Sequence, residues 1–63
     1  MTKYTVVTAS NGDTGIRVYM TKAADAQGAI DNAKLMDAED YPENKSEFSA
    51  VEVFENSIPV YSV

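Results

Sequence analysis

One stretch of this 63-residue chain has the period of an α-helix, and it separates two pairs of segments that have the period of β-strands. The stretch spans residues 21–36, and at 3.6 residues per turn its small and apolar side chains share one face: Ala26, Ala29, Ile30, Ala33 and Met36. Asp25 stands where a carboxylate can cap the first turn. The pattern predicts a helix over about residues 25–36 that packs through a narrow face, with Ile30 as its most buried residue.

Alternating segments flank the predicted helix on both sides. Before it, residues 3–9 and 15–20 surround an Asn-Gly pair, which is typical of a β-hairpin. After it, residues 48–54 and 58–63 are separated by a short polar turn. Pro59 has no amide hydrogen to donate to a ladder, so the last strand is expected either at an edge of the sheet or hydrogen-bonded on only one side near its start.

These segments predict a single α+β domain over residues 1–63, with the order ββαββ and one antiparallel sheet that carries the helix across one face. The order of the strands within the sheet stays open. The residues expected to face the helix are the apolar members of the alternating segments: Ile16, Val18, Met20, Val51, Val53 and either Ile58 or Val60.

The opposite face of the predicted sheet is expected to be aromatic, and its candidate contact residues are Tyr19, Phe48, Phe54 and Tyr61. Such a face on a small chain favours contact with another protein or with a second copy of the chain. Aromatic sheet faces also stack nucleic-acid bases, but those sheets combine the aromatic residues with basic ones. Here Glu52 lies between the two phenylalanines, so protein contact is the favoured interpretation.

The formal net charge of −5 is concentrated in one part of the chain. Residues 25–47 contain seven acidic residues and two lysines, while the charges of the remaining residues cancel. A surface of this sign disfavours direct binding to nucleic acid. It is instead a candidate contact surface for a basic protein partner, and its residues are Asp31, Asp37, Glu39, Asp40, Glu43 and Glu47.

The residue types that most catalytic sites need are missing. The chain has no cysteine and no histidine, so zinc ligand sets and pairs of a nucleophile with a histidine are excluded. Asp37, Glu39 and Asp40 are expected in an open loop, where neighbouring carboxylates are typical of a solvated charge run, and their spacing fits no calcium loop. The chain is predicted to be no enzyme and to hold no cofactor or metal. It has neither an apolar run of membrane length nor the pattern of a secretion signal, which predicts a soluble intracellular protein.

Residues 17–34, RVYMTKAADAQGAIDNAK, lead from a strand into a helix whose alanines are spaced for packing on a sheet. This phrase resembles the strand-to-helix junction of small phage-encoded host-takeover proteins, such as the phage inhibitor of bacterial RNA polymerase, and of HicB-like antitoxins. Gln27 and Gly28 stand where those families usually have glutamates, and no binding residue is carried over. The resemblance implies a phage or mobile-element protein that acts in the cytoplasm of a bacterial host by blocking another protein.

Two functions follow as hypotheses. The first is an inhibitor that offers its acidic surface to the basic groove of a larger protein, with carboxylates in the places of nucleic-acid phosphates. The alternative is an assembly protein that associates with itself, for example as a homodimer, through the aromatic sheet face or through an edge strand. Binding through the acidic surface should weaken steeply with salt, whereas apolar self-association should not.

Overall fold

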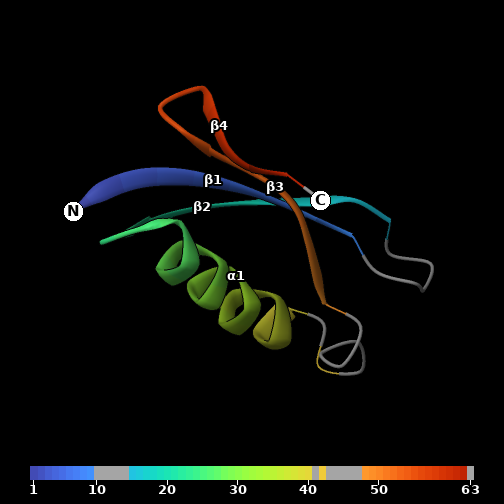
Figure 1. The fold of residues 1–63 in the computed structure, drawn as a ribbon. Coiled ribbons are helices and arrows are strands. Elements are labelled where there is room, and N and C mark those ends of the chain that lie inside the picture. Colours follow the sequence, from blue (N-terminus) through green and yellow to red (C-terminus); the bar gives the residue numbers. More distant parts are fainter. Residues whose placement is uncertain (10–14, 41, 43–47, 63) are drawn as a thin grey trace.

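The computed structural model of the protein describes residues 1–9, 15–40, 42 and 48–62. Within these ranges, strands and a helix follow one another as ββαββ, which confirms the predicted α+β class and the order of the elements (Figure 1). The elements are β1 Thr2–Ala9, β2 Arg17–Ala23, α1 Ala26–Asp40, β3 Ser49–Glu55 and β4 Ile58–Ser62.

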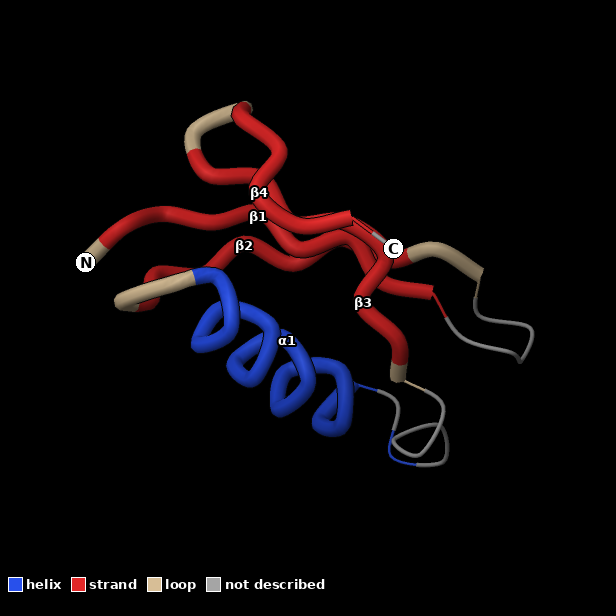
Figure 2. Tube along the Cα trace, viewed as in Figure 1, coloured by secondary structure: helices blue, strands red, loops and turns tan. Residues whose placement is uncertain are grey.

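All four strands form one antiparallel sheet in the order β2-β1-β3-β4. β1 and β3 are therefore central, while β2 and β4 are the two edges, and the position of Pro59 in β4 confirms the expected edge strand. α1 connects the two hairpins and lies across one face of the sheet (Figure 2). No helix of the described residues covers the other face, which we call the open face.

The start of α1 is set by the predicted cap. The Oδ1 atom of Asp25 accepts a hydrogen bond from the amide of Gly28 at 2.8 Å, and the Ala29 amide donates to the carbonyl of Asp25 at 3.1 Å. The end of α1 differs from the prediction, because the helix continues beyond residue 36 to Asp40. Asp37, which was expected in an open loop, is instead part of the last helical turns and is buried.

Small side chains allow α1 to lie close to the sheet. Ala29 and Ala33 are fully buried, and a Cβ atom added at Gly28 would lie 3.4 Å from the Cβ of Ala23 in β2. The predicted packing of α1 on the sheet through a narrow, alanine-rich face is therefore confirmed. Ile30 is only half-buried, so its prediction as the most buried residue of the helix is wrong. The alanine stripe forms the centre of the contact, and Ile30 lies beside it.

The faces of β2 are opposite to those predicted. Arg17, Tyr19 and Ala23 of β2 are buried, whereas the predicted core residues Ile16, Val18 and Met20 are exposed. Polar contacts of Arg17 and Tyr19, described below, hold this face of β2 against α1, and the spacing of apolar residues does not predict them. The resulting core consists of Tyr4, Val6, Tyr19, Ala23, Ala29, Ala33 and Val53.

A β-bulge in β3 changes which residues of that strand face α1. Val7 is opposite Glu52, but the next residue, Thr8, is opposite Ala50, so Val51 is an extra residue in the ladder. Because one extra residue reverses the alternation of faces, Phe48 and Ala50 pack against the same core as Val53. The prediction of Phe48 on the open face is therefore wrong.

The apolar side chains of β4 do not complete the core either. Ile58 and Val60 were alternatives for a residue facing the helix, but all residues of β4 are exposed. The core thus ends at β3, and β4 extends the sheet beyond the width that a single helix covers (Figure 1).

The alanine stripe gives a matched pair of helix variants. We expect Ala33→Leu to lower the free energy of unfolding by about 1–3 kcal/mol, because its added volume has no space between α1 and the sheet. Lys34→Leu places the same side chain one residue later, at an exposed position, and should change stability by about 0.5 kcal/mol or less. Urea unfolding of both variants measures the difference, and equal effects would show that the stripe is not the closest helix–sheet contact.

Candidate functional site

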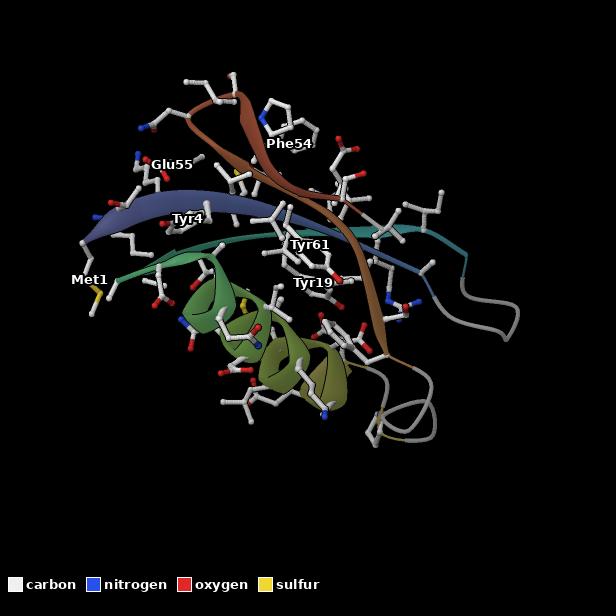
Figure 3. The ribbon with its side chains drawn as sticks, viewed as in Figure 1. Met1, Tyr4, Tyr19, Phe54, Glu55 and Tyr61 are labelled. Atoms are coloured by element: carbon white, nitrogen blue, oxygen red, sulfur yellow. The ribbon has the colours of Figure 1, made fainter. Side chains whose placement is uncertain are left out.

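A buried polar cluster joins β2 to the C-terminal half of α1. The Nε atom of Arg17 donates to the Oδ1 atom of Asp37 at 2.6 Å, and the hydroxyl of Tyr19 donates to the same oxygen at 2.8 Å. Asp37 has no exposed surface, and Arg17 is 9% exposed. The hydroxyl of Thr8 in β1 donates to the carbonyl of Arg17 at 3.3 Å, which ties the cluster to the centre of the sheet. Figure 3 shows Tyr19 between the sheet and α1.

The electrostatics of the cluster favour the charged form of Asp37. Burial alone would raise the pKa of this carboxyl group, but the hydrogen bonds from Arg17 and Tyr19 and the charge of Arg17 outweigh burial, and the pKa of Asp37 is lowered. Burial, followed by the hydrogen bond to Asp37, raises the pKa of Tyr19 to about 12. Asp37 is therefore ionised, and the hydroxyl of Tyr19 keeps its proton, throughout the neutral range.

The cluster has the geometry of a structural contact and lacks access for a substrate. Asp37 is enclosed, and three hollows at the surface of the described residues are lined by other residues. Sequence reasoning missed the cluster, although one signal was present: Asp37 continues the four-residue spacing of Ala29 and Ala33 on the buried face of α1.

The acidic surface predicted from the sequence is only partly at the surface. Asp31, Glu39 and Asp40 are exposed on α1. Asp37 is a correction, because its contacts with Arg17 and Tyr19 withdraw it from solvent. Two further members of the predicted acidic surface lie outside the described residues, Glu43 and Glu47.

The predicted aromatic set is also divided between two faces. Phe54 is half-buried and lies on the side of the sheet away from α1 (Figure 3). Tyr19 belongs to the core, and Phe48 packs against it, so the assignment of both to the open face is corrected. Tyr61 is 40% exposed and is opposite Val53 in the ladder, which places it on the α1 side of the sheet.

The open face is aliphatic where it was expected to be aromatic. Val18 and Met20 of β2 are 57% and 76% exposed on this face, and Ile16, which directly precedes the strand, is 71% exposed. In the ladder, Met20 is opposite Thr5, and Thr5 is opposite Phe54, so a continuous row crosses three strands. Reversal of the faces of β2 is the reason why these residues meet solvent.

A basic pair marks one end of the open face. Lys3 and Lys22 are directly opposite each other in the β1–β2 ladder, and both are exposed. They line a hollow of ≈ 370 Å³ together with Met20 and with Asn56 and Ser57, the two turn residues of the β3–β4 hairpin. The open face therefore combines apolar side chains with two positive charges, although the protein as a whole is acidic.

The described residues contain no group of three acidic residues placed to hold a metal ion. The described helix is too short and too polar to cross a membrane. Comparison of the chain with protein-family models, with curated proteins and with solved structures found no match.

The buried cluster is tested by removal of a single hydroxyl group. Tyr19→Phe should lower the free energy of unfolding by about 1.5–3 kcal/mol, since a hydrogen bond to a charged group is lost inside the protein. Tyr61→Phe removes a hydroxyl from a partly exposed ring and should cost less than about 0.5 kcal/mol. Equal losses in urea unfolding would contradict the assigned role of Tyr19.

The same cluster predicts how stability depends on pH. Because the pKa of Asp37 is lower in the folded protein, its contribution is present above the unfolded value of about 3.9 and is lost as the pH falls below it. The pKa of Tyr19 is raised, so its contribution is complete below about pH 10 and is lost as the pH rises through about 12. Urea unfolding from acid to alkaline pH measures both losses of stability. The exposed-site variant Asp31→Asn should keep the loss of unfolding free energy at acid pH, and Tyr19→Phe should reduce the loss at alkaline pH.

Proposed function

We propose that this chain is a non-enzymatic protein-binding module and that its open face is the binding surface. The observation that carries the proposal is the exposure of Ile16, Val18 and Met20 on a sheet face that no described helix covers. Contiguous apolar side chains at a protein surface mark sites of protein contact. The absence of histidine and cysteine from the sequence supports a binding role over a catalytic one.

The size of the apolar surface is sufficient for a useful contribution to binding. Full burial of one aliphatic side chain contributes about 1.5–3 kcal/mol, and three such chains are more than half exposed here. Association costs at least about 4 kcal/mol in lost freedom of motion, so the face supports binding of moderate strength. The hydrogen-bonded sheet holds the backbone of these residues in place before a partner arrives, which keeps the ordering cost small.

The charge of the open face indicates the chemistry of its partner. Lys3 and Lys22 are like charges placed directly opposite each other, an arrangement that disfavours the folded sheet. A carboxylate of a partner near both ammonium groups would offset this repulsion. The partner that fits is therefore a protein surface with apolar side chains bordered by an acidic residue.

A second candidate surface is the acidic end of α1, and one observation favours it. Glu39 and Asp40 are exposed in the last turn of the helix, where the helix dipole opposes negative charge, and this described turn itself holds no basic residue. An unfavourable local choice of this kind is typical of a functional surface. Through it, the protein would inhibit a larger protein by occupying a basic groove that normally holds nucleic acid.

Photo-crosslinking with a matched position tests the first candidate. A benzophenone side chain is placed at Met20 on the open face or at Lys34, which is exposed on α1, and both proteins are irradiated in an extract of the cell that makes the chain. The crosslinked polypeptide is then purified and its affinity measured. Met20→Ser and the pair Lys3→Glu with Lys22→Glu should each weaken binding about tenfold or more, whereas Lys34→Glu should leave the affinity unchanged.

The two candidate surfaces give opposite results in the same assay. Binding through the open face should persist at high salt and should survive Glu39→Gln combined with Asp40→Asn. Binding through the acidic end of α1 should weaken steeply with salt and should be lost in that double variant. A partner that crosslinks only at Lys34, or that binds the Met20→Ser variant as tightly as the original chain, would reject the open face.

A further inference from the structure

The two edges of the sheet differ in how they are protected from pairing with another strand. β4 carries Pro59 and a register shift, both of which disturb the regular ladder that another strand would need. β2, whose residues are all described, contains no proline and no glycine, and its pairing with β1 has no register shift. The β2 edge is therefore regular and open to strand addition.

The outward direction of the β2 peptide groups follows from a side-chain contact. The Nδ2 atom of Asn32 in α1 donates to the carbonyl of Lys22 at 3.1 Å, which places that carbonyl on the side of β2 away from β1. In an antiparallel strand, every second residue directs both its amide and its carbonyl to the same side. Val18 and Met20 therefore direct their peptide groups outward as well. α1 occupies the Lys22 end of the edge, and the Val18–Met20 part is left without a covering side chain among the described residues.

Apolar side chains flank this edge on both faces of the sheet. On the open face lie the exposed side chains of Ile16, Val18 and Met20. On the other face, a groove of ≈ 460 Å³ between β2 and α1 is lined by Thr21, Asn32, Leu35, Met36 and Glu39. Leu35 is 68% exposed there.

We propose that two copies of this chain form a symmetric dimer by antiparallel pairing of their β2 strands. With the two-fold axis at Tyr19, Val18 of each copy faces Met20 of the other, and these pairs exchange backbone hydrogen bonds. The result is one eight-stranded sheet with both α1 helices on the same face. Leu35 and its groove then lie beside those of the second copy on the α1 side. On the open face, Val18 and Met20 contact their counterparts sideways across the paired edges, and their outer surfaces stay accessible.

The charge pattern of the strand supports a second copy as the occupant of this edge. In this register Arg17 faces Thr21 and Lys22 faces Ile16, so no two positive side chains are opposite each other. The chain also has enough surface for such an interface. It exposes 4097 Å², and a standard interface uses about 800 Å² on each partner, roughly a fifth of that surface. Backbone pairing alone covers less, which is why side-chain contacts across the paired edges, on both sides of the sheet, are part of the proposal.

This dimer goes beyond the proposed function and is compatible with it, since it leaves the open face uncovered and joins two such faces into one.

Sedimentation equilibrium from micromolar to millimolar concentration should show a transition from 6.9 kDa to twice that mass. Val18→Lys should raise the dissociation constant about tenfold or more, because it places a charge in the interface. Ile58→Lys introduces the same charge at a strand residue of similar exposure on the β4 edge and should have no effect.

Hydrogen exchange of the original chain tests the register and does not depend on how any variant folds. The amides of Val18 and Met20 should exchange slowly at high concentration and rapidly at low concentration, because only the dimer gives them an acceptor. A protein that remains monomeric at millimolar concentration overturns the proposal. A dimer that survives Val18→Lys, or whose Val18 and Met20 amides exchange rapidly, overturns it equally. A monomer that still binds a partner through Met20 rejects the dimer alone, whereas a dimer without such a partner rejects only the proposed function.

Discussion

The buried contact of Asp37 with Arg17 and Tyr19 is the constraint on which most of this structure depends. Removal of two charged groups from water costs several kcal/mol for each ion, so a buried pair persists only with good geometry and additional hydrogen bonds. Here a single carboxylate oxygen accepts from both a guanidinium and a phenol. The contact extends α1 to the turn that carries Asp37, and it turns the odd-numbered residues of β2 toward the helix.

The exposed apolar row is a direct consequence of that choice. If apolar burial alone decided the orientation of β2, then Ile16, Val18 and Met20 would lie under α1 and Arg17 would meet solvent. A strand has only two faces, so placing Arg17 and Tyr19 in the core forces their neighbours outward. The same polar contact that closes one face of the sheet therefore gives the other face its apolar character, from which both the proposed binding surface and the proposed dimer follow.

Local signals were sufficient to predict the elements of this fold and insufficient to predict its faces. The alanine spacing of α1, the cap at Asp25 and the alternating segments are properties of a few neighbouring residues, and the structure confirms each of them. Which residues of β2 face α1 depends on the contact of Arg17 with Asp37, twenty residues away in the sequence. The face on which Phe48 lies depends on the β-bulge in β3, which no residue type in that strand predicts. The prediction of the candidate site residues was wrong for the same reasons. Tyr19, Asp37 and Phe48 were assigned to surfaces, but they contribute to the interior.

The pairing of β1 with β3 has a consequence for how the chain reaches this structure. Tyr4 is opposite Glu55, so the central ladder joins residues from nearly opposite ends of the sequence. Each hairpin can form locally, but an isolated two-stranded hairpin is marginal in water, and the core lacks Val53 until the second hairpin meets the first. The entropy of closing almost the whole chain must therefore be lost before the β1–β3 ladder forms, which slows the folding of a chain of this size and makes it more cooperative. During synthesis, a chain that still lacks β3 leaves one side of β1 without its neighbouring strand. The whole sheet therefore assembles only after the last third of the sequence has been made.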